Sequence, residues 1–453
     1  GATFAALQRI ALQPEEQAAA DLPGLPRYAM ALTVDPKAGT FEGTQLITYT
    51  NGTGAALPDL ALRSYVNFPP DVLGDGGETE MNVLSATVDG RPAELRREAQ
   101  RTLFRVTLPA PLAPGATVTL GTSFKGTLEP WDDRTWPFLS SYPMLAPWDA
   151  AAGDWRADVT RFPDHVYAES ALYDVSVTLP QPYQVFATGS PIAGGADAAN
   201  QTTRFVSGPV REWAASFGEF DSVSTRTNGI TVTAYKAKGA AVNLPRIQDV
   251  AASALESYER RFGAYPYREL DLHAMAWSGD AGIEFPGYVV ILVGGAVNQQ
   301  TDVVVAHEVA HQWWYGLVGN DIYRQPWLDE SFAHYSTVVA TEDREGAGAA
   351  QAVYREAIVR LYDRGKAAGD PPAGLAITEY ANFNSYYYAI YGKGAVFLAT
   401  LREEIGDESF FGGMRAYYAA QRYGVSSRAA FQGAMETAAG RSLEPIFDQW
   451  LER

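Results

Sequence analysis

Two histidines and a glutamate lie close together in one apolar segment of the chain. Residues 303–311 read Val-Val-Val-Ala-His-Glu-Val-Ala-His, so His307 and His311 lie four positions apart and Glu308 follows the first of them. Side chains four apart on a helix project from one face, which lets both imidazoles reach one ion. Glu308 is then placed to take a proton from a metal-bound water and to return it to a leaving amine. The segment predicts hydrolytic metal chemistry.

A catalytic zinc site needs a third protein ligand and an open fourth position. Glu330 follows His311 after eighteen intervening residues, within Trp-Leu-Asp-Glu-Ser-Phe-Ala at 327–333. Pro326 is suited to begin a helix, and a helical hairpin would return Glu330 to the two histidines. His334 is one turn further along the same face, so spacing alone also leaves it open as a ligand. We expect one Zn²⁺ per chain, held by His307, His311 and Glu330.

Composition limits the other kinds of site and partner. The 453 residues include no cysteine, so any metal must be bound by nitrogen and oxygen ligands. The formal net charge is -18, from 53 acidic and 35 basic residues, which repels phosphate backbones and favours cationic ligands. We therefore expect no nucleic-acid partner. No apolar run approaches the length of a membrane span. Compartment and oligomeric state stay open, and a signal peptide removed from an exported protein is compatible with the sequence.

Two halves with different patterns must position these residues. From Tyr28 to Asp221 the chain reads as short alternating segments separated by turn residues, which is typical of a β domain. Beyond it we expect a helix over 244–262, strands over 269–292, and helices over 301–316, 326–342, 347–367 and from 392 onwards. The predicted fold is multidomain α+β, with an N-terminal β domain at 1–223 and a mainly helical catalytic domain with a small sheet at 224–453.

The metal segment resembles a known family, the gluzincin zinc aminopeptidases typified by aminopeptidase N and leukotriene-A hydrolase. The shared pattern is His-Glu-x-x-His, eighteen residues, and then a glutamate within Trp-Leu-Asn-Glu-Gly-Phe-Ala. Here Asp329 and Ser331 replace the family's asparagine and glycine. The resemblance implies a saddle-like β domain followed by a thermolysin-like catalytic domain. It also implies a two-domain form without the family's helical C-terminal domain, since the chain stops sixty-two residues after Tyr391.

Two further segments extend the resemblance. Residues 281–286, Ala-Gly-Ile-Glu-Phe-Pro, are similar to the family's Gly-x-Met-Glu-Asn, which implies that Glu284 binds the substrate ammonium and that the backbone at Gly282 lies along the substrate. Residues 390–395, Ile-Tyr-Gly-Lys-Gly-Ala, resemble the family's Tyr-x-Lys-Gly-Ala, which implies that the Tyr391 hydroxyl stabilises the oxyanion. Without the resemblance, Glu284 would be interpreted as a solvated loop charge, and Tyr391 as part of an aromatic cluster in the core.

The resulting prediction is a zinc metallo-aminopeptidase that hydrolyses the first peptide bond of peptides with a free amino terminus. Glu308 and Tyr391 are the catalytic candidates, and Glu284 and Gly282 the substrate-binding ones. A zinc endopeptidase that lacks the ammonium anchor is one alternative, and a non-catalytic zinc-bound scaffold is another. An epoxide hydrolase activity, known in one branch of the family, is disfavoured by the expected lack of the C-terminal domain. Side-chain preference at the first substrate residue is not readable from the sequence.

Overall fold

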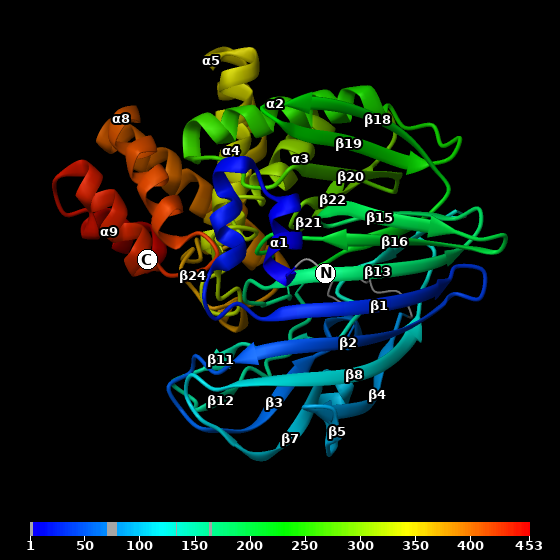
Figure 1. Ribbon diagram of the computed structural model, residues 1–453. Helices are drawn as coiled ribbons and strands as arrows, with labels where there is room; N and C mark the ends of the chain where they lie inside the picture. Colours follow the sequence, from blue (N-terminus) through cyan, green and yellow to red (C-terminus); the bar gives the residue numbers. More distant parts are fainter. Residues whose placement is uncertain (1–2, 70–78, 133, 163–164) are drawn as a thin grey trace. The chain divides into compact units, whose positions relative to one another are not determined.

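The computed structural model describes residues 3–69, 79–132, 134–162 and 165–453 (Figure 1). Within them the chain forms two compact units. The first consists of Gly1–Ser222, Tyr235–Ala240 and Pro266–Asp271, and the second of Val223–Ala234, Ala241–Tyr265 and Leu272–Arg453. The predicted order of a β-rich half followed by a mainly helical half is confirmed. The domain boundary at residues 223 and 224 stays a prediction.

A large sheet is the main element of the first unit. Its strands run in the order β15-β16-β13-β1-β2-β8-β4-β5 (Figure 1). Along β1, exposed and buried side chains alternate, and Tyr28, Met30, Leu32 and Val34 all face the core. This alternation is the pattern of a sheet that covers a core with one face. The strands are β1 (Arg27–Asp35), β2 (Thr40–Thr50), β4 (Met81–Val88), β5 (Arg91–Pro92), β8 (Thr117–Thr127), β13 (Leu172–Pro180), β15 (Ser190–Ala196) and β16 (Asn200–Val206).

Three smaller sheets also lie within the first unit, in the orders β10-β3-β7-β6, β14-β17-β9 and β11-β12. Their strands are β3 (Leu57–Arg63), β6 (Leu95–Glu98), β7 (Leu103–Leu112), β9 (Thr135–Phe138), β10 (Met144–Leu145), β11 (Trp148–Asp149), β12 (Asp154–Trp155), β14 (Gln184–Ala187) and β17 (Ala215–Gly218). The short helices are α1 (Phe4–Gln8), η1 (Arg9–Ala11), η2 (Pro14–Asp21), η3 (Tyr65–Asn67) and η4 (Ala99–Arg101).

The later part of the chain has one five-stranded sheet, in the order β18-β19-β20-β22-β21. Strand β21 lies at its edge, where only one side of its backbone pairs with a neighbour. Val289, Val290 and Ile291 of β22 are fully buried, which agrees with a strand covered on both faces. The strands are β18 (Phe220–Thr227), β19 (Ile230–Ala237), β20 (Glu269–Ala276), β21 (Ala281–Phe285) and β22 (Tyr288–Val293), with a separate pair of β23 (Gly319–Asn320) and β24 (Val425–Ser426).

Helices make up most of the second unit. They are α2 (Leu244–Phe262), α3 (Gln299–Ala310), α4 (Trp327–Glu345), α5 (Ala347–Val353), η5 (Tyr354–Val359), α6 (Arg360–Ala367), η6 (Ile377–Glu379), α7 (Phe383–Tyr387), η7 (Tyr388–Gly394), α8 (Ala395–Gln421), α9 (Arg428–Ala439) and α10 (Glu444–Leu451). The segments η5 and η7 are π-helical. Within the described residues, no helix is long and apolar enough to cross a membrane.

The helix expected over 301–316 is shorter than predicted. Helix α3 ends at Ala310, and Gly316, Leu317 and Val318 donate their N–H groups to carbonyls five residues earlier, at 2.8 to 3.1 Å. This wider turn brings Tyr315 to a φ of 95°. It also buries Trp313 and Trp314 completely against the neighbouring aromatic rings. Burial of two indoles therefore ends the helix where periodicity alone would continue it.

Candidate metal centre

Helix α3 presents the two histidines. Its N-terminus is capped by Asn298, whose side chain accepts from the N–H of Gln300 at 2.7 Å, while Thr301 accepts from the N–H of Asn298 at 3.2 Å. Such a cap satisfies N–H groups that the first turn leaves without intrahelical partners. His307 lies in the last turn of α3, and His311 is its C-cap residue. Both imidazoles therefore emerge at the C-terminal end of the helix.

Helix α4 brings Glu330 to them. It begins at Trp327, with Pro326 at the N-cap position, one residue before the first helical position. The Tyr258 hydroxyl of α2 lies 2.9 Å from the carbonyl oxygen of Ala306 and 3.1 Å from that of Ser336, so it contacts both α3 and α4. This buried contact fixes the spacing of the two helices on which the candidate ligands are carried.

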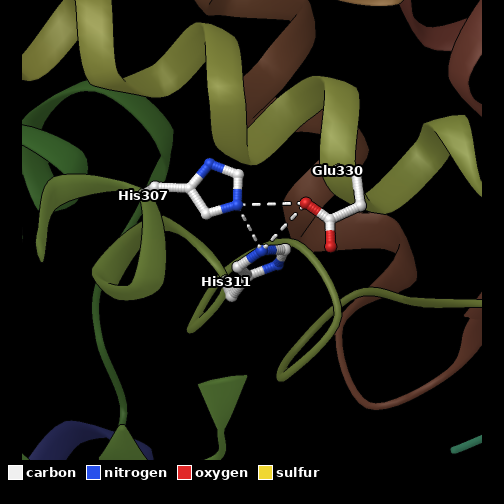
Figure 2. A group of neighbouring side chains, drawn as sticks. All are labelled: His307, His311 and Glu330. Atoms are coloured by element: carbon white, nitrogen blue, oxygen red, sulfur yellow. Dashed lines mark hydrogen bonds and ion pairs between the residues drawn. The ribbon is translucent and has the colours of Figure 1, made fainter. Parts of the chain in front are cut away.

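Three ligand atoms converge between these helices (Figure 2). Nε2 of His307 lies 3.0 Å from Oε2 of Glu330 and 3.0 Å from Nε2 of His311, and the last pair of atoms is 3.4 Å apart. Ligands bound at about 2.0 to 2.1 Å around a tetrahedral zinc ion lie about 3.3 Å from one another. Two imidazole nitrogens and a carboxylate oxygen also match the ligand preference of Zn²⁺. The residues present fit the expected ion.

Burial and charge at the cluster favour a cation. His307, His311 and Glu330 are at most 8% exposed. Burial lowers the pKa of His307 and so favours the neutral imidazole that metals bind. Burial raises the pKa of Glu330, but the two histidines outweigh it and hold this pKa well below its ordinary value. The carboxylate is therefore available as an anionic ligand.

Each histidine has a partner for its second ring nitrogen. Nδ1 of His311 lies 2.8 Å from Oδ1 of Asp329 and 3.1 Å from the carbonyl oxygen of Trp314. Both partners accept, so Nδ1 carries the proton and Nε2 keeps a lone pair for the metal. His334, which spacing alone left open as a ligand, is not part of the cluster. Its Nδ1 lies 3.3 Å from Nδ1 of His307, whereas Glu330 contacts the other ring nitrogen of His307, Nε2.

Strand β21 packs directly on Glu308. A Cβ atom added at Gly282 would lie 2.3 Å from the Cγ, Cδ and Oε1 atoms of Glu308, so only glycine leaves room for this carboxylate. Glu308 is 4% exposed. The structure thus brings together the candidate base and the candidate substrate-binding strand, two segments that the sequence separates by more than twenty residues.

Glu284, on the same strand, points to the metal cluster. One of its carboxylate oxygens lies within 4.8 Å of ligand atoms of both His311 and Asp329. Burial raises its pKa well above the ordinary value. It is a half-buried strand residue, so the interpretation as a solvated loop charge is wrong. A cation bound beside Glu284 would offset the burial and favour its ionised form, so this side chain is suited to hold an ammonium group.

Tyr391 lies in the π-helical segment η7, and its ring stacks on that of His307 with centroids 5.8 Å apart and an interplanar angle of 16°. The Ser331 hydroxyl, adjacent to Glu330 in the chain, donates to the carbonyl of Ile390 at 2.7 Å. Gly394 leaves space for this contact, because a Cβ there would lie 2.1 Å from the Ser331 hydroxyl oxygen. The tyrosine segment is therefore tied directly to the helix that carries Glu330.

The sequence did not reveal the partners of the outer histidine nitrogens. In the sequence, Asp329 is only a departure from a family pattern, and His334 is only a competing candidate ligand. One signal was available, since residues one turn apart on a helix lie on one face, and His334 follows Glu330 by four. The nitrogen to which each partner binds depends on ring orientations that tertiary packing sets.

Comparison with known proteins gives a matching family model and several curated relatives. Residues 247–450 match the peptidase family M1 domain. Aminopeptidase N of Lactococcus lactis subsp. lactis is 29% identical over 266 residues, which cover 53% of this chain and 30% of that protein. Aminopeptidase N of Streptomyces lividans is 26% identical and covers 46% of this chain and 26% of its own length. The chain thus spans about 30% of the length of the curated relatives it matches.

Solved structures match nearly the whole chain. An M1 zinc metallopeptidase from Deinococcus radiodurans superimposes with a TM-score of 0.71, at 19% identity, over 94% of this chain and 93% of its own. A two-domain M1 zinc metallopeptidase variant bound to L-arginine gives a TM-score of 0.72 at 19% identity, over 98% and 95% of the two chains. At these identities the likeness establishes the fold. Residues 247–450, which include the candidate metal centre, are therefore similar to the peptidase family M1 domain.

Proposed function

We propose that this protein is a zinc aminopeptidase that hydrolyses the first peptide bond of substrates with a free amino terminus. The observation that carries the proposal is the convergence of His307, His311 and Glu330, whose ligand atoms lie 3.0 to 3.4 Å apart. A carboxylate oxygen of Glu284 lies within 4.8 Å of a ring nitrogen of His311. A metal site alone supports hydrolysis. A second carboxylate beside it supports selection of a charged amino terminus.

Each residue has a distinct task in the proposed reaction. Zinc held by the three ligands would lower the pKa of a bound water and polarise the scissile carbonyl. The Glu308 carboxylate accepts the proton of the attacking water and returns it to the departing amine. The Tyr391 hydroxyl donates a hydrogen bond to the oxyanion, and a preorganised donor of this kind is typically worth about 2.7 to 4 kcal/mol.

Glu284 sets the register of the substrate. Its carboxylate binds the substrate ammonium by charge-assisted hydrogen bonds, so that only the first peptide bond reaches the attacking water. The backbone of β21 at Gly282 lies beside Glu308 and is the proposed surface for the substrate main chain. Peptide substrates are supported by the family match, whereas the preferred first residue is set by pocket walls outside this cluster.

The test compares free and blocked substrates on the zinc-loaded protein. We expect an aminoacyl anilide with a free amino group to be cleaved and its N-acetyl derivative to be inert, because acetylation removes the charge that Glu284 binds. Equal rates on both would show an endopeptidase. Cleavage of neither, nor of longer peptides, by protein with one zinc per chain would support the scaffold alternative.

A further inference from the structure

The second nitrogen of His307 faces another histidine and not a carboxylate. We propose that His334 is a positioning residue that fixes the tautomer of His307, so that its Nε2 lone pair is directed to the metal. The inference rests on the proposed metal-binding function of the His307, His311 and Glu330 cluster, and it adds a residue that is not itself a ligand.

Both ring nitrogens of His334 have a partner at hydrogen-bond distance. Nε2 lies 3.1 Å from the carbonyl oxygen of Ala357, in the π-helical segment η5, and Nδ1 lies 3.3 Å from Nδ1 of His307. The rings of the two histidines meet edge to face, with centroids 5.4 Å apart and an interplanar angle of 71°. His334 is 8% exposed, so water has little access to replace either contact.

The direction of each hydrogen bond follows from the chemistry of the groups. A carbonyl oxygen can only accept, so Nε2 of His334 must carry a hydrogen. In a neutral imidazole the other nitrogen is then an acceptor, and Nδ1 of His334 therefore receives a hydrogen from Nδ1 of His307. His307 in turn keeps an unprotonated Nε2, the atom that lies 3.0 Å from Oε2 of Glu330. The Ala357 carbonyl thus determines, through His334, which nitrogen of His307 is free.

The two metal-binding histidines are oriented by different kinds of acceptor. His311 uses Asp329 and a backbone carbonyl, whereas His307 uses a neutral imidazole. A neutral acceptor orients the ring without adding a negative charge to a cluster that already contains Glu284, Asp329 and Glu330. Loss of such an outer partner typically weakens metal binding by about 10 to 100-fold.

The experiment measures zinc affinity by competition with a chromogenic chelator. His334→Asn keeps an acceptor oxygen at the position of Nδ1, while His334→Leu removes it. We expect His334→Leu to raise the dissociation constant for zinc by about 10 to 100-fold, and His334→Asn to raise it by much less. Thr341→Val is the matched control, since Thr341 lies on the same helix and its hydroxyl bonds only locally, to the carbonyl of Thr337 at 2.8 Å. Glu330→Ala, which removes a ligand, gives the scale of full loss.

Equal zinc affinity in His334→Leu and wild type, or equal loss in both His334 variants, would overturn the proposal. Nitrogen-15 NMR of the zinc-loaded wild-type protein gives an answer that does not depend on the folding of any variant. The chain has only five histidines, so their ring signals can be assigned. We expect the Nε2–H tautomer for His334 and the Nδ1–H tautomer for His307, and the opposite pair would contradict the inference. Failure of wild-type protein to bind zinc would instead refute the proposed function.

Discussion

The role of Glu308 can be tested directly, because this residue lies beside the candidate metal ligands and is not itself one of them. Its carboxylate is buried, contacts the backbone at Gly282, and follows His307 in the chain. A glutamine has the same shape and cannot accept a proton, so the substitution separates acid-base chemistry from packing.

We expect Glu308→Gln to lower kcat by about 10² to 10⁴-fold while the protein still binds one zinc per chain. The measurements are turnover of a free aminoacyl anilide and zinc content by atomic emission. Glu408→Gln, an exposed glutamate on α8, is the control and should behave as wild type. Turnover unchanged in Glu308→Gln would assign the base to another residue.

The residues that form the cluster could be predicted from the sequence, but the contacts between their individual atoms could not. Spacing predicted that His307, His311 and Glu330 lie together. Residues four apart share one face of a helix, and a helical hairpin brings the next helix alongside. Spacing could not show that His334 approaches the far side of His307 or that Asp329 approaches His311. Those contacts depend on side-chain rotamers, which the packing of α3 against α4 selects.

At the scale of elements, β21 and α3 form one functional pair. The edge strand contacts Glu308 so closely that a side chain at Gly282 has no room. An added Cβ would meet the outer atoms of the Glu308 side chain, which can move away, so the methyl group should displace the carboxylate and leave the fold intact.

We expect Gly282→Ala to lower kcat by roughly tenfold or more, since even a small misplacement of a catalytic group is costly. Zinc content and the urea midpoint of unfolding should change little. Gly279→Ala is the matched control, because a Cβ there meets nothing within 4 Å. A kcat equal to that of the control would show that Glu308 does not need its observed position.

The elements were predicted well where periodicity is regular and poorly where the chain turns. The helix at 244–262 was predicted with its bounds, and the strands of the following sheet with their approximate place. The end of α3 could not be predicted, because it depends on burial of Trp313 and Trp314 against aromatic rings that are distant in the sequence. The π-helical form of η7 was equally hidden, since its sequence gives no period that distinguishes it from an α-helix.

At the scale of the whole molecule, stability depends on groups outside the site. His273, on β20, is fully buried, and burial lowers its pKa to about 3. In the unfolded chain a histidine takes up its proton near pH 6.5, so between about pH 6.5 and pH 3 the unfolded state binds more protons. The contribution of His273 to stability is therefore complete above pH 6.5 and decreases as the pH falls through this window.

We expect His273→Gln to reduce the pH dependence of the unfolding free energy. For the wild type, a folded pKa of about 3 makes His273 alone cost about 1.4 kcal/mol of stability between pH 7.5 and pH 5.5. Urea unfolding of both proteins at the two pH values gives the difference. If the variant loses as much stability as the wild type on acidification, His273 is not the group that binds the proton.

The hydroxyl of Tyr258 contacts the backbone of both α3 and α4, at residues that are not candidate metal ligands. The spacing between α3 and α4 is therefore set by the side chain of Tyr258. A chelated sample is expected to keep its helical circular dichroism and to recover full occupancy on simple addition of zinc, with no slow refolding phase. The side chains that would bind zinc are thus expected to be in place before the ion binds.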